Sequence, residues 1–144
     1  MKYQKQMPLK ATNLYQQIID AYLSNFQFYN HDIKSLHPGT FIHRQFYTKI
    51  HREAVNGTMK VIQMKENEYL EIHIDYGQGE LIQSYTLKSL DSSTQLTYEE
   101  ENTFTQKLMQ INYHLVSIFY KLIFNYQTRK RFKALERMSS HDTL

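Results

Sequence analysis

The spacing of hydrophobic positions changes to alternation at residue 41. From there to residue 103, apolar and polar side chains alternate, which is typical of β-strands with one buried face. Interruptions rich in Gly, Asn, Asp and Ser divide the stretch. The pattern predicts five strands, at about 42–52, 58–65, 68–76, 80–90 and 94–103.

Each interruption has the composition of a tight turn. Asn56-Gly57 is a strong hairpin dipeptide because both residues accept a positive φ. Lys65 to Glu68 is a polar four-residue turn, Gly77-Gln78-Gly79 supplies two permissive backbones, and Asp91-Ser92-Ser93 is a conventional turn. Consecutive antiparallel hairpins joined by such turns predict a meander.

The segments before the meander predict a strand and a helix. Residues 1–7 alternate and end at Pro8, as a short strand does. Thr12 or Asn13 can cap a following helix that continues to about residue 25. Residues 26–40 are expected to be irregular, with a short helical turn around Asp32 to Leu36.

The last third of the chain predicts one long helix. Residues 104–137 contain neither Gly nor Pro, and their apolar side chains recur at helical spacing. Because the alternating sheet must bury its apolar face, we expect this helix to pack on the sheet through Leu115, Phe119 and Leu122. The predicted fold is α+β, a helix-grip arrangement in which a curved antiparallel sheet surrounds the C-terminal helix. It forms a single domain over residues 1–144.

Several tyrosines fall on the predicted inner face of the sheet. A Tyr side chain combines an apolar body with a hydroxyl that needs a partner when buried. Alternation also turns Glu100 inward, and a buried carboxylate is a candidate site. The residues expected to line a ligand pocket of at least about 300 Å³ are Tyr47, Tyr76, Tyr85, Tyr98, Glu100 and Phe119. Plain core packing explains the same residues, so both interpretations stay open.

Composition narrows the class of protein. The 144 residues include no Cys, so neither disulfides nor thiolate metal sites can form. No apolar run follows the basic N-terminus, and Leu115 to Tyr126 is too short and too interrupted to span a bilayer. The sequence therefore predicts a cytoplasmic protein.

Charge is unevenly distributed. Residues 63–101 carry two Lys/Arg against nine Asp/Glu, whereas residues 102–144 carry seven against two. These segments can neutralise one another within the domain, or a surface anion can contact the basic group at the end of the predicted helix. That basic group is formed by Arg129, Lys130, Arg131 and Lys133. With a net charge of +3 and no nucleic-acid-binding module, a nucleic-acid partner is disfavoured and a membrane surface is a weak alternative.

Catalytic and cofactor motifs are not evident. Gly77-Gln78-Gly79 lacks the third Gly and the following helix of a dinucleotide site. The seven His are scattered without metal-ligand spacing, and His73 with Asp75 is expected to face water. The sequence indicates no cofactor and no metal. An enzyme using Glu100 as acid or base is the weakest of the functional hypotheses.

Four short patterns resemble a known bacterial family. They are Phe46-Tyr47-Thr48-Lys49, Tyr85-Thr86-Leu87-Lys88, Thr97 to Glu101, and Arg129 to Lys133. Together they resemble domain of unknown function 3284, within the START/Bet v 1-like superfamily. The resemblance implies a helix-grip fold whose cavity, in related proteins, holds lipids, hormones or other apolar molecules.

Two functional hypotheses follow. In the first, the chain is a binding module that holds a small apolar or amphipathic molecule between sheet and helix. In the second, side chains fill the interior, and the chain is an interaction or regulatory protein that acts through its surface and the basic group. The sequence identifies neither the ligand nor the oligomeric state.

Overall fold

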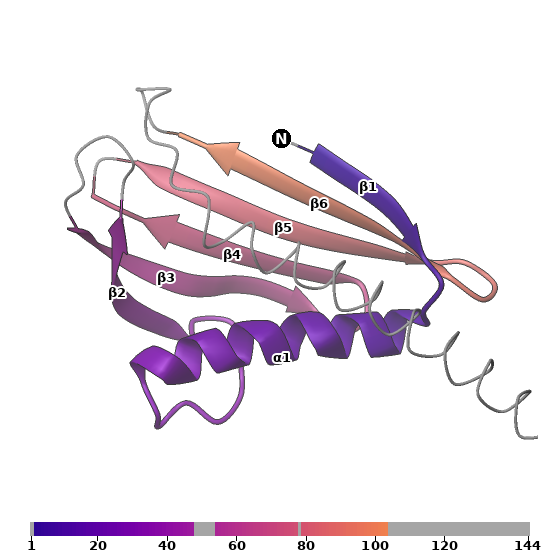
Figure 1. Cartoon of the computed structure of the whole chain (residues 1–144), viewed down its shortest axis with the longest axis horizontal. Coiled ribbons are helices and arrows are strands. Elements are labelled where there is room, and N and C mark those ends of the chain that lie inside the picture. Colours follow the sequence, from indigo (N-terminus) through magenta and orange to yellow (C-terminus); the bar gives the residue numbers. More distant parts are fainter. Residues whose placement is uncertain (1, 48–53, 78, 104–144) are drawn as a thin grey trace, which may run out of the picture. The chain divides into compact units, whose positions relative to one another are not determined.

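The computed structural model describes residues 2–47, 54–77 and 79–103, with the backbone alone at residues 46, 47, 54 and 55 (Figure 1). The described residues belong to one compact unit. Its elements are β1 (Lys2–Met7), α1 (Ala11–Tyr29), β2 (Phe41–Tyr47), β3 (Ala54–Lys65), β4 (Tyr69–Asp75), β5 (Glu80–Ser89) and β6 (Thr94–Asn102).

The strands form one antiparallel sheet in the order β1-β6-β5-β4-β3-β2 (Figure 1). Strands β2 to β6 follow one another, which confirms the predicted meander. The first strand returns to pair with the last, from Lys2 opposite Glu99 to Met7 opposite Thr94. Within the described residues, one helix and a six-stranded antiparallel sheet confirm the α+β class.

Three of the predicted turns are confirmed. Glu68 donates its N–H to the carbonyl of Lys65 at 2.9 Å, and Leu90 donates to Ser93 at 2.8 Å. Gly77 adopts a φ of 81°, which a side chain would disfavour, and its turn places β5 directly beside β4. Local turn chemistry therefore determines these hairpins.

The prediction of a turn at Asn56-Gly57 is wrong. These two residues lie within β3, opposite Gln45 and Arg44, and neither has a positive φ. Strands β2 and β3 stay paired as far as residues 47 and 54, so their connection lies in residues 48–53, outside the described residues. The pairing that buries Ile42 against Met59 fixes this register and overrides the local preference of the dipeptide.

The helix also differs from its predicted bounds. It begins at Ala11, with Lys10 at the N-cap and no side-chain cap, and continues to Tyr29. Asn13 and Leu14 donate their N–H groups to the carbonyl of Lys10 at 3.1 and 3.0 Å, so Thr12 and Asn13 lie inside the helix, whose first buried side chains are Leu14 and Tyr15. Residues 30–40 form turns in place of the predicted helical turn, beginning where the Asn30 side chain accepts a hydrogen bond from the N–H of Asp32.

The core lies between α1 and the inner face of the sheet. From the helix, buried side chains recur at helical spacing: Leu14, Tyr15, Ile18, Tyr22 and Phe26. From the sheet, alternate residues of β4, β5 and β6 are buried, as predicted. The predicted helix at 104–137, with Leu115, Phe119 and Leu122, lies outside the described residues. In the part of the chain that the structure describes, no helix is both long and apolar enough to cross a membrane.

Candidate functional site

Two neighbouring strands bring polar side chains into the core. Gln83 and Tyr85 point inward from β5, and Tyr98 and Glu100 point inward from β6. Gln83 lies opposite Glu100 across the two strands, and Tyr85 lies opposite Tyr98. Gln83, Tyr85 and Tyr98 have no exposed surface, and Glu100 is 8% exposed. Alternation along two paired strands thus places four hydrogen-bonding side chains together in an apolar layer.

A fifth residue, Tyr22 of α1, joins them from the opposite layer. Its hydroxyl lies 2.9 Å from Gln83 Oε1 and 2.9 Å from the Tyr85 hydroxyl. Gln83 Nε2 donates to the Tyr98 hydroxyl at 2.7 Å, and that hydroxyl donates to Glu100 Oε1. We call these five residues the inner polar chain.

The carboxylate gives the inner polar chain a direction. Glu100 accepts from Tyr98, so the Tyr98 oxygen must itself accept, and Gln83 turns its NH₂ toward it. The amide oxygen then faces Tyr22, which donates to it, and Tyr85 in turn donates to Tyr22. Each hydrogen bond of the inner polar chain is therefore donated in the direction of Glu100.

Burial keeps these hydroxyls protonated. Desolvation is the largest cause of the raised pKa values of Tyr22, Tyr85 and Tyr98, because a buried phenolate loses its hydration. The negative charge of Glu100 raises all three pKa values further. The tyrosines therefore act as neutral hydrogen-bond donors throughout the physiological pH range.

Tyr76, the residue after β4, lies near the same carboxylate. Burial raises its pKa, the charge of Glu100 raises it further, and Arg44 of β2 lowers it. Burial also lowers the pKa of Arg44, whose guanidinium lies 4.7 Å from the ring centroid of Tyr29 and donates to Asn25 Oδ1 at 3.2 Å. A cation and an anion therefore both act on Tyr76.

The structure shows the positions of part of the set expected to line a pocket, and their role in a pocket stays a prediction. Tyr85, Tyr98 and Glu100 are brought together by direct contacts, and Tyr76 shares their electrostatic environment. The side chain of Tyr47, the residue Phe119 and the basic group of Arg129, Lys130, Arg131 and Lys133 lie outside the described residues. Sequence reasoning missed Tyr22 and Gln83, although Gln83 interrupts an inward apolar series between Leu81 and Tyr85.

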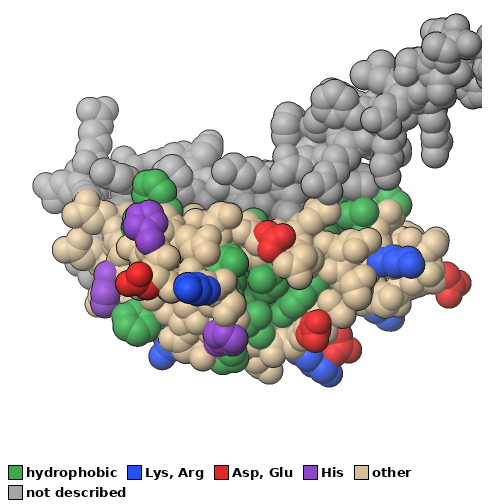
Figure 2. All heavy atoms as spheres, turned by 90° about the horizontal axis from the view of Figure 1, so that it is seen from below, with side chains coloured by type: hydrophobic (Ala, Val, Ile, Leu, Met, Phe, Trp, Pro, Cys, Tyr) green, Lys and Arg blue, Asp and Glu red, His purple; other side chains and the backbone are tan. Residues whose placement is uncertain are grey.

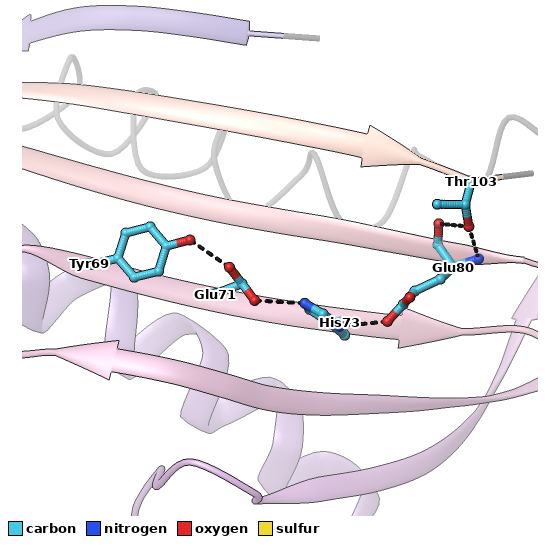
Figure 3. Close-up of polar contacts among 5 residues, drawn as sticks. All are labelled: Tyr69, Glu71, His73, Glu80 and Thr103. Atoms are coloured by element: carbon cyan, nitrogen blue, oxygen red, sulfur yellow. Dashed lines mark hydrogen bonds and ion pairs between the residues drawn. The ribbon is translucent and has the colours of Figure 1, made fainter.

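A second polar cluster lies on the outer face of the sheet, away from α1 (Figure 3). Tyr69 donates to Glu71 at 2.6 Å, and the two ring nitrogens of His73 lie 2.7 Å from Glu71 and 2.5 Å from Glu80. His73 and Asp75 face away from the core, as predicted, and Asp75 is exposed. Only 23% of the His73 side chain is exposed, because carboxylates face both of its ring nitrogens. We call Tyr69, Glu71, His73 and Glu80 the outer cluster.

The outer cluster does not converge on a point. Its His73 nitrogens face different carboxylates in opposite directions. In the described residues no group of three or more His, Asp or Glu side chains is arranged to hold a metal ion.

Among the clefts formed by the described residues, three lie at the borders of the sheet. One of about 720 Å³ is formed around Arg44, Gln45 and Thr58, and one of about 440 Å³ around Tyr29, Ile33 and Phe41. The third, of about 800 Å³, lies where the start of α1 meets the turns after β3 and β5. The inner polar chain lines none of the three. The predicted pocket between sheet and C-terminal helix stays a prediction, because that helix lies outside the described residues.

Comparison with known proteins agrees with this architecture. Among solved structures, Ara h 8.0201 is 10% identical with a TM-score of 0.59, over 89% of this chain and 97% of that one. DynU16, from the dynemicin biosynthetic locus, is 13% identical with a TM-score of 0.60, over 89% of this chain and 47% of that one. CalU16 from Micromonospora echinospora is 10% identical with a TM-score of 0.53, over 96% of this chain and 83% of that one.

Identities this low show the fold alone, which is Bet v 1-like. No curated protein matches the sequence. The family model described as Domain of unknown function (DUF3284) matches residues 1–121, most of the chain. The chain therefore belongs to the DUF3284 family.

Proposed function

We propose that this chain is a binding module that holds a small amphipathic molecule against the inner face of its sheet, beneath the predicted C-terminal helix. The observation that carries the proposal is the inner polar chain. Binding sites for small molecules are mostly apolar and contain a few convergent polar groups. Leu81, Leu87 and Leu96 supply apolar surface on this face, and Glu100 supplies the convergent charge.

The chemistry of Glu100 indicates the class of ligand. A nearly buried carboxylate is stabilised by donors, and a charge-assisted hydrogen bond is about twice as strong as a neutral one. Tyr98 is one such donor. A ligand with an apolar body and an amine or hydroxyl group would add another, and the hydroxyl of Tyr76 lies in the same electrostatic environment. The Bet v 1-like fold supports this placement, because it can hold a ligand between its sheet and a helix.

A fluorescent apolar amine, N-phenyl-1-naphthylamine, tests the proposal by titration. We expect saturable binding to the full chain, weakened roughly tenfold by Glu100→Gln, because replacing a hydrogen bond to a charged acceptor by one to a neutral acceptor loses about 1.4 kcal/mol. Glu99→Gln is the matched control, since Glu99 is the neighbouring residue of β6 and pairs with Lys2 at the surface. Equal affinities of the two variants, or fluorescence that never saturates, would contradict the proposal.

A further inference from the structure

The sheet has two edges, and they differ in how they are protected. Proteins protect an edge strand with charged side chains, Pro or an early end, because its free backbone groups can pair with another chain. β1 follows this rule: it contains Lys2 and Lys5 and ends before Pro8. β2 does not, because its one charged residue, Arg44, packs toward Tyr29 and Asn25.

The register shows which backbone groups of β2 face outward. Val61 donates to the carbonyl of Thr40 at 2.8 Å, so Thr40 belongs to a hydrogen-bonded position. Such positions alternate along an antiparallel pair, which directs the backbone of Ile42 and Arg44 toward β3. The backbone groups of Phe41, His43 and Gln45 then point to the free edge. In the described part of the chain, the sheet has no strand beyond β2.

The exposed side chains of β2 beside this edge include no Lys, Arg, Asp or Glu. Phe41 is 51% exposed, and His43 and Gln45 are also exposed. Figure 2 shows hydrophobic and His side chains interspersed with charged ones at the left, the side on which β2 lies in Figure 1. Exposed apolar groups gathered at one place are typical of interaction surfaces.

We propose that the free edge of β2 is a homodimer interface, at which a second copy of this chain adds its own β2 antiparallel about His43. A two-fold axis at His43 pairs all the outward backbone groups: His43 with the partner's His43, and Phe41 with the partner's Gln45. This arrangement is self-complementary, as a two-fold interface must be. It also places Arg44 opposite the partner's Ile42, so that the two Arg44 charges do not face each other.

The surface beside the edge of β2 also fits a second copy of the chain. Gln45 forms a wall of the cleft of about 720 Å³, together with Asn56 and Thr58. Side chains directly opposite across an antiparallel pair lie about 5 Å apart. The partner's Phe41 therefore lies at this cleft, and Phe41 of the first copy lies at the partner's cleft. Each copy supplies both a protruding ring and a hollow.

Sedimentation equilibrium of the full chain from about 1 µM to about 1 mM tests the proposal. The interface is small, so we expect a reversible dimer with a Kd of roughly 10–100 µM. His43→Lys places two like charges opposite each other and should raise the Kd at least about tenfold. Thr86→Lys is the matched control, because it adds the same charge to the outer face of an interior strand and should leave the Kd unchanged.

A charge-swap experiment makes the test specific to this register. His43→Lys and His43→Glu should each be largely monomeric, and their equimolar mixture should recover a heterodimer, because opposite charges then face each other across the axis. Amide exchange at Phe41, His43 and Gln45 should slow as the wild-type protein concentration rises. A wild-type chain that stays monomeric to about 1 mM, or a dimer equally sensitive to His43→Lys and Thr86→Lys, would overturn the proposal.

Discussion

The same Tyr-X-Glu sequence occurs on both faces of the sheet. In β6, Tyr98 donates to Glu100 inside the core; in β4, Tyr69 donates to Glu71 on the outer face. The two Tyr-Glu pairs have the same sequence spacing and the same side chains, and only their surroundings differ. The inner carboxylate is 8% exposed, whereas 21% of the Glu71 side chain is exposed and His73 lies beside it.

This comparison shows how burial changes the role of one motif. At the outer face, water can replace any lost hydrogen bond, so each contact contributes little to stability. In the core, a lost partner leaves a polar group unsatisfied, and the cost is that group's desolvation. The inner polar chain therefore fixes side-chain positions, which a binding site requires, and the outer cluster does not.

Removing the tyrosine hydroxyl from each motif should give the largest difference in unfolding free energy between the inner and the outer face. Tyr98→Phe removes the hydroxyl that donates to Glu100 and accepts from Gln83 Nε2 inside the core, and we expect a loss of about 3 kcal/mol in the free energy of unfolding. Tyr69→Phe should cost less than about 1 kcal/mol, because solvent reaches both partners. Urea unfolding of the two variants measures both values. Equal losses would show that burial does not separate the two motifs.

The second-largest effect should be a loss of stability at alkaline pH that comes from the buried tyrosines and not from the exposed ones. The folded-state pKa of Tyr85 is raised above the unfolded value of 10.0 by burial. Below pH 10, Tyr85 is protonated in both the folded and the unfolded chain, and its full contribution to the free energy of unfolding is present. Above pH 10 the unfolded chain loses its proton first, so stability falls by about 1.4 kcal/mol per pH unit until the folded-state pKa is reached.

Tyr85→Phe removes this titration. Its unfolding free energy, measured in urea at several pH values above 10, should fall less steeply than that of the wild type, by about 1.4 kcal/mol per pH unit. Tyr3→Phe is the control, since Tyr3 is an exposed residue of β1. Parallel curves for the wild type and Tyr85→Phe would mean that Tyr85 ionises as readily in the folded chain as in the unfolded one.

Salt should produce the smallest effect and act on one face only. Glu71→Gln removes the carboxylate charge that accepts from Tyr69 and faces His73, and we expect a loss of less than about 1 kcal/mol in the free energy of unfolding at low ionic strength. The loss should diminish as salt is added, because exposed charges are screened. The loss caused by Tyr98→Phe should not change with salt. Salt dependence of the inner variant would indicate that water and ions reach Glu100.

Alternation in the sequence was sufficient to predict the six strands and the inward position of Glu100. Both follow from a period of two that any half-buried strand must have. It did not predict that Gln83 and Tyr22 complete the inner polar chain. Gln83 is polar at an inward position, and Tyr22 has the spacing of an ordinary core residue. Their contact depends on how α1 lies on the sheet, which no local pattern encodes.

The errors at Asn56-Gly57 and at the helix start have one physical cause. A turn dipeptide or a capping residue contributes about 1 kcal/mol. The pairing of β2 with β3 and the burial of Leu14 and Tyr15 involve many residues and outweigh it. The outer position of His73 was predicted correctly, but its two carboxylate partners were not, because Glu80 comes from the next strand.

A native mass spectrum of freshly purified full chain tests most directly whether the inner polar chain serves ligand binding. We expect part of the protein to carry a small molecule that is released on denaturation and is depleted in Glu100→Gln but not in Glu99→Gln. The released molecule should combine an apolar body with an amine or hydroxyl group. A native mass equal to the mass of the polypeptide, in the wild type and in both variants, would contradict the proposed binding function.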